Sequence, residues 1–213
     1  MTVNLKVKAK KWIFVGLICA LAATLVPVLR ARMDAAEEIA RLAKLMGWKE
    51  GTIVADIGAG DGEYSFVAVE HVGASGKVFS TEIDKAKLKE IRNEVKKRNL
   101  SNVIVVESAE AETNLPEACC DAIFLRRVYH HLTKPIEFDA SLIRSLKPAG
   151  RLAIIDFPPH PEYGRVKGVP KDREEHGIQQ KILIDEVTKA GLQLEEVVNA
   201  WDGDSYCVLF VKK

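Results

Sequence analysis

The stretch most informative for chemistry is residues 54–62, which read VADIGAGDG. Its three glycines permit tight turns and a close approach of the backbone to a ligand. The dinucleotide-binding fingerprint needs a glycine at its sixth position, where this chain has Glu63, so that pattern fails. Asp56 and Asp61 would repel a pyrophosphate, but they suit a cationic ligand that carries an ammonium and a sulfonium group.

A carboxylate further along the chain is placed to bind the same ligand. Glu82 comes twenty residues after Gly62, at the end of an expected strand. There its side chain can accept hydrogen bonds from both hydroxyls of a ribose. A solvated surface acid is the alternative for an isolated glutamate, but the preceding glycine loop favours the ribose-binding role.

Side chains that can exchange protons lie where a substrate would enter the expected site. Tyr129, His130 and His131 follow the expected strand over residues 122–126. Histidine is the natural proton acceptor near neutral pH, so His130 and His131, and more weakly Tyr129, are candidate catalytic residues.

Two arginines, Arg126 and Arg127, end the same strand. In one interpretation, one of them pairs with Asp156 or Glu110 while the other faces solvent. In the other interpretation, Arg126 binds an acidic group of the substrate.

Alternating hydrophobic periodicities predict the elements that position these residues. A helix is expected over residues 34–46, with Asp34 as its N-cap and Gly47 as its stop. Strands are expected over residues 52–56, 77–81, 103–107, 122–126, 151–156, 192–199 and 206–211, and further helices over residues 63–71, 85–98, 135–146 and 179–190. This alternation predicts an α/β fold with a doubly wound, mostly parallel seven-stranded sheet and helices on both faces. The long loop over residues 157–177 is expected to be functional or mobile.

The composition is that of a globular protein and excludes several classes. The chain is 47% apolar and 29% charged with a net charge of +1, so no nucleic-acid partner is expected. Its four cysteines are too few and too scattered for a disulfide scaffold, and they lack the partners of a zinc-binding pattern. We therefore expect free thiols and no bound metal.

An apolar segment precedes the expected domain. Residues 12–29 carry no charge over 18 residues, and as a helix they would extend about 27 Å, close to the thickness of the bilayer hydrocarbon. Basic residues flank both ends, which fits a buried core helix poorly. Residues 20–22 resemble a signal-peptide cleavage site, but the apolar run continues past it. We expect a membrane anchor within residues 1–32 and one domain over residues 33–213, with cleavage as the alternative.

Together these motifs resemble the class I S-adenosylmethionine-dependent methyltransferase family. The likeness covers residues 33–213. It rests on VADIGAGDG at 54–62, STEID at 80–84, CDAIFLRRVYHHL at 120–132 and LKPAGRLAIID at 146–156. The first and last motifs are specific in combination, although neither would suffice alone.

The resemblance assigns roles to individual residues. It implies that the methionine part of the cofactor, S-adenosylmethionine, contacts Asp56, Gly58 and Gly60. It implies that Glu82 binds the ribose and that Ile83 lies against the adenine face. The adenine edge is flanked, by the same likeness, by Ala109 and Glu110. In this family a histidine pair at 130–131 is also often structural, capping the next helix.

The chain departs from the family pattern at three places. Relatives often carry an aspartate where this chain has Ala109, so Glu110 or a backbone carbonyl takes its role. The turn usually written Pro-Gly-Gly is Pro148-Ala149-Gly150, which we expect to be a harmless change. The third departure is Arg126-Arg127, since relatives often have small or amide residues there.

The resemblance implies methyl transfer to a small-molecule or lipid-like acceptor by a membrane-tethered enzyme. Two alternatives stay open: a catalytically inactive membrane-bound module and a nicotinamide-dependent oxidoreductase. The charges leave the side of the membrane unresolved. Four lysines before the apolar segment outnumber two arginines after it, which predicts a translocated domain, whereas the cofactor is made in the cytosol.

Overall fold

The computed structural model describes residues 35–213 except residue 174. The chain divides into two compact units, residues 1–38 and 39–213, and the second contains the whole sheet. The expected anchor, its boundary with the domain and the proposed cap Asp34 lie outside the described residues. Within the described part of the chain, no helix is both long and apolar enough to cross a membrane.

Seven strands form one sheet in the spatial order β3-β2-β1-β4-β5-β7-β6. The strands are β1 (Ile53–Ile57), β2 (Lys77–Glu82), β3 (Val103–Glu107), β4 (Cys120–Arg126), β5 (Leu146–Asp156), β6 (Gln193–Val198) and β7 (Tyr206–Val211). Strands β1 to β5 pair in parallel, and β7 runs antiparallel between β5 and β6. The expected doubly wound, mostly parallel sheet with a closing strand pair is confirmed.

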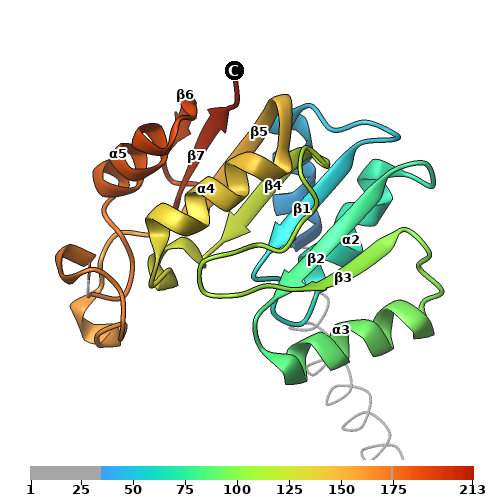
Figure 1. Cartoon of the computed structure of the whole chain (residues 1–213), viewed down its shortest axis with the longest axis horizontal. Coiled ribbons are helices and arrows are strands. Elements are labelled where there is room, and N and C mark those ends of the chain that lie inside the picture. The colour runs from blue at the N-terminus through green and yellow to red at the C-terminus, as the bar shows by residue number, and fades with distance from the viewer. Residues whose placement is uncertain (1–34, 174) are drawn as a thin grey trace, which may run out of the picture. The chain divides into compact units, whose positions relative to one another are not determined.

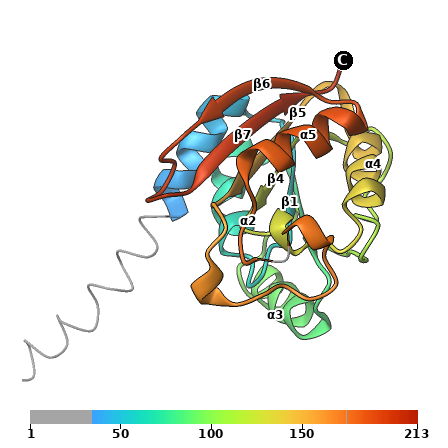
Figure 2. The same ribbon diagram turned by 90° about the vertical axis from the view of Figure 1, so that its left-hand side faces the viewer.

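Helices cover both faces of this sheet (Figures 1 and 2). They are a helix over residues 35–46, α2 (Glu63–Val72), α3 (Lys85–Lys97), α4 (Pro135–Ser145) and α5 (Gln180–Ala190), with short 3-10 turns η1 (Tyr129–His131), η2 (Pro161–Tyr163) and η3 (Lys171–Arg173). Residues 39–46, α2 and α3 pack on one face, and α4 and α5 pack on the other.

Strand β4 shows how the sequence builds two cores from one sheet. Successive side chains of a strand point to opposite faces. Ala122 and Phe124 therefore join the core beneath α2, whereas Ile123 and Leu125 join the core beneath α4. All four are buried, as expected for a central parallel strand that is covered on both sides.

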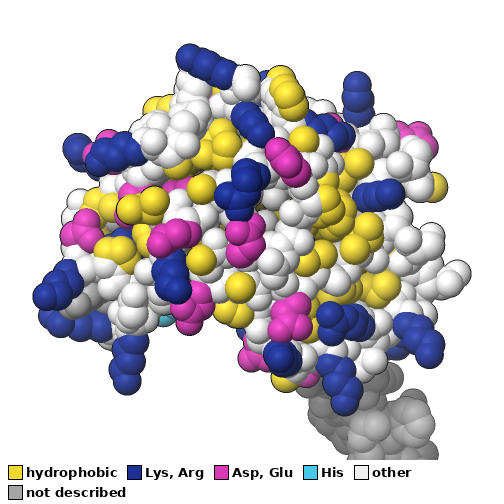
Figure 3. Space-filling model, in the orientation of Figure 1, with side chains coloured by type: hydrophobic (Ala, Val, Ile, Leu, Met, Phe, Trp, Pro, Cys, Tyr) yellow, Lys and Arg dark blue, Asp and Glu magenta, His cyan; other side chains and the backbone are white. Residues whose placement is uncertain are grey.

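One part of the sheet has a helix on only one face. The connection between β3 and β4, residues 108–119, forms turns and loop without a helix. On the side that α4 and α5 cover elsewhere, Ile104 of β3 is consequently 38% exposed. Hydrophobic side chains gather over β1 to β3 on this face of the molecule (Figure 3).

Strand β5 begins earlier than the sequence predicted, at Leu146 instead of residue 151. Leu146 pairs with Cys120 across a bulge, which extends the strand through the expected turn. Within this stretch Ala149 has a φ of 61°, a left-handed conformation that favours glycine. The alanine in the place of the usual glycine is therefore a strained substitution and not a neutral one.

Candidate functional site

The glycine loop leaves β1 and enters α2 through three left-handed residues. Gly58, Gly60 and Gly62 have φ values of 71°, 62° and 86°. A Cβ at Gly58 would lie 2.6 Å from Cγ2 of Val128, so this glycine permits a close packing contact with the end of β4. A Cβ at Gly60 would have no atom of the described residues within 4 Å, so open space lies above that residue. The loop thus offers a ligand its closest approach at Gly60.

The carboxylate of Glu82 ties this loop to the end of β2. Its Oε2 accepts a hydrogen bond from the backbone N–H of Gly60 at 2.9 Å. Its Oε1 accepts from the N–H groups of Ile83 and Asp84 at 2.8 and 3.0 Å. A carboxylate offers about four acceptor positions, so Glu82 keeps capacity for a ligand hydroxyl. Glu82 is only 7% exposed, which excludes the solvated surface acid.

Asp56 lies buried at the base of the same loop. Its Oδ2 accepts from the hydroxyl of Ser65 at 2.7 Å, and that hydroxyl also lies 2.8 Å from Oγ of Ser80. Burial raises the pKa of Asp56 to about 7, partly offset by the Ser65 hydrogen bond. Its charge is therefore sensitive to pH near neutrality, a property that the sequence did not indicate.

The expected adenine contacts lie next to these carboxylates. Ile83 follows Glu82 directly, and its side chain is 53% exposed, which is unusual for isoleucine and leaves an apolar face open to a ring. Ala109 begins a tight turn after β3, in which its N–H donates to the carbonyl of Glu112 at 2.8 Å. Glu110 is exposed and lies 3.8 Å from Nζ of Lys134. These three roles stay predictions.

The two arginines at the end of β4 have partners that the sequence did not name. The guanidinium of Arg126 lies over the ring of Tyr64, 4.5 Å from its centroid. Arg127 lies 3.5 Å from a carboxylate oxygen of Asp202 and has a φ of 55°. Asp156, suggested as an arginine partner, instead bonds His130.

Tyr129 is buried on the side of α4 and α5. Its hydroxyl donates to Oδ2 of Asp139 at 2.8 Å, with Oε2 of Glu186 at 3.0 Å. Burial, reinforced by these two carboxylates, raises its pKa well above the ordinary value of 10.0. These contacts give Tyr129 a structural role, and a catalytic role in exchanging protons near neutral pH does not fit them.

His130 is 1% exposed and held from β5 by Asp156. Asp156 accepts from the backbone N–H of His130 at 3.1 Å and lies 2.8 Å from its Nδ1. The alternative helix-capping role does not hold, because the N-cap of α4 is Lys134 and no side chain in the described part of the chain caps that helix. Among the described residues, Nε2 of His130 has no hydrogen-bond partner although it is buried.

His131 and His176 complete a cluster around that nitrogen. The ring centroids of His131 and His176 lie 4.0 and 4.8 Å from that of His130. Although the side chain of His131 is exposed, desolvation by the surrounding protein and the two neighbouring imidazoles lower its pKa to about 4, so it is neutral at pH 7. Sequence reasoning missed His176; the only signal was its place in the long loop over residues 157–177.

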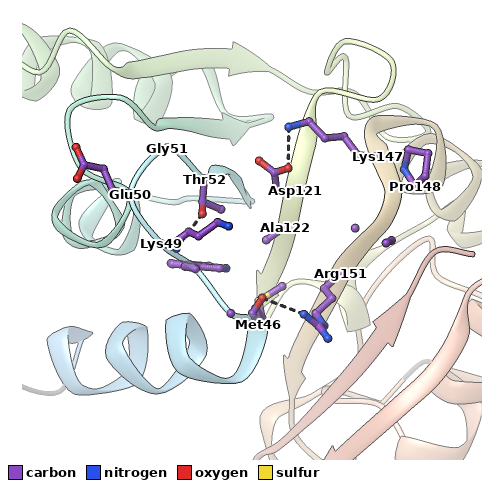
Figure 4. A pocket seen from close by; sticks show the side chains of 14 residues that line it. Met46, Lys49, Glu50, Gly51, Thr52, Asp121, Ala122, Lys147, Pro148 and Arg151 are labelled. Atoms are coloured by element: carbon purple, nitrogen blue, oxygen red, sulfur yellow. Dashed lines mark hydrogen bonds and ion pairs between the residues drawn. The ribbon is translucent and has the colours of Figure 1, made fainter.

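A pocket of about 380 Å³ lies at the opposite edge of the sheet, before β1 begins (Figure 4). Its polar groups are engaged with one another: Lys147 lies 2.7 Å from Asp121, which also accepts from the N–H of Ile53 at 2.8 Å. Ligands of parallel α/β sheets bind at the carboxyl ends of the strands. We therefore interpret this pocket as structural.

Comparisons with known proteins agree with the geometry of the carboxyl edge. The family described as "Methyltransferase domain" matches residues 48–193. A demethylmenaquinone methyltransferase of Listeria welshimeri is 29% identical over 113 residues, which is 53% of this chain and 48% of that protein. A protein-L-isoaspartate O-methyltransferase 2 of Archaeoglobus fulgidus is 31% identical over 122 residues, 57% of this chain and 53% of that protein.

Among solved structures, an S-adenosylmethionine-dependent methyltransferase from Aquifex aeolicus superimposes with a TM-score of 0.69 at 29% identity, covering 82% of this chain and 89% of that one. The chain belongs to the methyltransferase family, and the resemblance seen in the sequence is confirmed. S-adenosylmethionine is the cofactor of this family, as expected. The chain spans about half the length of the curated relatives it matches.

Proposed function

We propose that this chain transfers the methyl group of S-adenosylmethionine to a small, quinone-like or lipid-like acceptor at a membrane. The observation that best supports this proposal is the buried carboxylate of Glu82, which accepts a hydrogen bond from the backbone N–H of Gly60 in the glycine loop. A glycine-rich loop and an acid at the ends of adjacent parallel strands form a nucleoside-binding edge. The acceptor and the membrane are supported by separate observations.

The residues at this edge fit the cofactor. The open space above Gly60 accommodates a ligand next to the backbone, and the exposed Ile83 offers the apolar surface that a purine requires. When ionised, Asp56 and Glu82 supply negative charge opposite a cationic ligand. Their placement explains why a pyrophosphate-bearing nicotinamide cofactor, the alternative ligand, is disfavoured.

When bound, S-adenosylmethionine supplies an electrophilic methyl group, so the protein mainly orients and dehydrates the reactants. Glu82 fixes the loop through Gly60, which prepares the binding surface before the ligand arrives. Val128 packs against Gly58 and thereby joins the loop to η1, where His130 and His131 lie. We propose that the methyl acceptor binds at this junction.

A quinone-like acceptor is supported by the relative from Listeria welshimeri, which is named a demethylmenaquinone methyltransferase. The apolar segment over residues 12–29 supports a membrane-dissolved acceptor, because an anchored enzyme meets such a substrate in two dimensions. An inactive module has no support from the site, since the loop glycines and Glu82 are all present.

The experiment is a methyl-transfer assay on the full-length chain in detergent micelles, with S-adenosylmethionine labelled in its methyl group. A demethylated naphthoquinol and an isoaspartyl peptide are offered in parallel. We expect label in the quinol, lost in Glu82→Ala and retained in Glu70→Ala, an exposed acid on α2 that serves as the matched control. Label in the peptide alone would overturn the proposed acceptor class. A third assay offers fractionated lipid and small-molecule extracts, and the absence of label in the quinol, the peptide and every fraction would overturn the proposed activity.

Membrane attachment has its own test. The full-length chain should stay with membranes in high salt and leave them in detergent, because an apolar helix is held by burial and not by charge. Recovery in the soluble fraction with a first residue near Ala23 would show cleavage. Release of the uncleaved chain by salt would show that the lysines alone held it.

A further inference from the structure

The histidines at the ends of β4 and β5 form a group that methyl transfer, as proposed above, does not require. His130 and His131 come from η1, and His176 comes from the loop that leads into α5. One ring nitrogen from each of the three lies within 4.8 Å of the other two. The three differ in exposure: His130 is buried, His176 is half-buried and His131 is exposed. The cluster therefore opens from the core to the surface.

The buried member is oriented as metal-binding histidines usually are. Ligating imidazoles commonly direct one ring nitrogen at a carboxylate and leave the other to the metal. Asp156 lies 2.8 Å from Nδ1 of His130 and accepts the backbone N–H of the same residue at 3.1 Å. The opposite nitrogen, Nε2, is buried without a hydrogen-bond partner among the described residues. A buried polar atom of this kind is costly unless something binds it.

We propose that His130, His131 and His176 bind one divalent transition-metal ion, for which Zn²⁺ is the probe. Imidazole is a preferred ligand of zinc and its neighbours in the first transition series. Three protein ligands and an open position are the arrangement of catalytic zinc sites, and the exposed face at His131 leaves such a position. The proposal departs from the sequence-based expectation of no metal, which considered only the cysteines and histidine pairs at short spacing.

The geometry needs little adjustment to close around an ion. Nitrogens bonded to zinc at about 2.0–2.1 Å lie about 3.4 Å apart in a tetrahedral site. In the structure the three ring nitrogens lie within 4.8 Å of one another. Rotation of the side chains can shorten these distances, because among the described residues neither His131 nor His176 forms a side-chain hydrogen bond that holds its ring. Phe157 stacks on His176 at an interplanar angle of 21° and closes one side of the histidine cluster.

The proposed metal site lies next to the place where we propose that the methyl acceptor binds. Val128, which packs against Gly58, is followed by Tyr129 and then by the two histidines. An oxygen atom of water or of an acceptor can occupy the open position of the ion. Metal-bound imidazole nitrogens cannot accept a proton, so a bound ion would remove His130 and His131 as candidate bases. It would instead lower the pKa of a hydroxyl bound to it, and the proton of that hydroxyl would pass to solvent water.

The test is a zinc titration of the full-length chain after stripping with a chelator, in competition with a chromophoric chelator. We expect one zinc ion bound through the cluster, and a loss of at least about 100-fold in affinity in His176→Ala. Asp156→Asn should lose about 10–100-fold, because it weakens the orientation of His130. The matched control is His160→Ala, the same change in the same loop, at a residue that pairs with Glu162 and Asp204. It should bind zinc as the wild type does.

Two readouts keep the test independent of folding and of methyl transfer. Cobalt bound in place of zinc should give the visible absorption of a tetrahedral site, absent in His176→Ala. S-adenosylmethionine binding should be unchanged in His176→Ala, which shows that the variant is folded. Zinc binding equal in wild type and His176→Ala, or lost equally in His160→Ala, overturns the site. Failure of the wild type to bind S-adenosylmethionine would overturn the proposed function and leave the metal site standing.

Discussion

The ends of β1 and β2 and the ends of β4 and β5 hold their functional groups by different means. In the first region, Glu82 accepts backbone N–H groups of the residues around it, including Gly60. In the second region, Asp156 forms a hydrogen bond with His130. Within the part of the chain that the structure describes, the side chains of His131 and His176 contact His130 through their rings alone. Backbone hydrogen bonds fix a loop locally, whereas the histidine cluster depends on where a long loop lies.

The difference predicts how each region of the chain responds to substitution. The cofactor region is a short, self-supporting motif that tolerates few changes of side chain. The histidine region is assembled from three segments, namely η1, the end of β5 and the loop that leads into α5. Changes to the first region should therefore affect folding and cofactor binding, and changes to the second should leave both intact.

The largest effect is expected for Gly58→Ala. The new Cβ would meet Val128 at 2.6 Å, and the φ of 71° is unfavourable for alanine. Overpacking and the left-handed conformation together should lower the free energy of unfolding by about 2–5 kcal/mol, measured by urea denaturation. Gly60→Ala, with a similar φ but open space, should lose only about 1–2 kcal/mol. Equal losses in the two variants would show that Val128 does not support the loop.

A smaller effect is expected from the titration of Asp56. Its pKa of about 7 means that it is mostly protonated at pH 6 and mostly ionised at pH 8. A cationic ligand prefers the ionised form, so the affinity for S-adenosylmethionine should fall about tenfold from pH 8 to pH 6. His131, with its pKa lowered to about 4, contributes nothing in this range.

The control for this pH dependence is Asp56→Asn. The ratio of wild-type to variant affinity removes the titration of the ligand and of all other groups. We expect this ratio to rise with pH between 6 and 8 in calorimetric titrations. A constant ratio would mean that the charge of Asp56 does not act on the cofactor.

The smallest effect is expected for Arg127→Gly, in the histidine region. Glycine relieves the φ of 55° but adds flexibility to the unfolded chain and removes an exposed ion pair with Asp202. These terms nearly cancel, so the free energy of unfolding should change by less than about 1 kcal/mol. A loss above about 2 kcal/mol would instead give the guanidinium a structural role at this edge.

The order of elements and the cofactor loop were predictable from the sequence because both depend on local patterns. Strand β3 and strand β7 have the expected bounds, and β1, β2 and β4 differ by only one or two residues. The run 54–62 and Glu82 fall at the ends of neighbouring strands, where parallel pairing brings them together. The early start of β5 was missed because Leu146 pairs across a bulge that no periodicity reveals.

The second region could not be predicted for the same reason that it differs from the first. His176 lies far from His130 in sequence, and no spacing rule connects a loop residue to a strand end. The partner of Asp156 was misassigned because an arginine is the usual expectation for a buried acid at a strand end. The path of the long loop, which decides both points, depends on tertiary contacts such as the stacking of Phe157 on His176.

Binding of S-adenosylmethionine by Glu82 and the glycine loop underlies every function proposed for this chain. The most direct measurement is a calorimetric titration of the full-length chain with S-adenosylmethionine and, separately, with NAD. We predict a single site for S-adenosylmethionine, no binding of NAD, and a loss of about 1.5–3 kcal/mol in Glu82→Ala, the range for hydrogen bonds to charged groups. Binding of NAD, or an unchanged affinity for S-adenosylmethionine in Glu82→Ala, would contradict this assignment of the cofactor site.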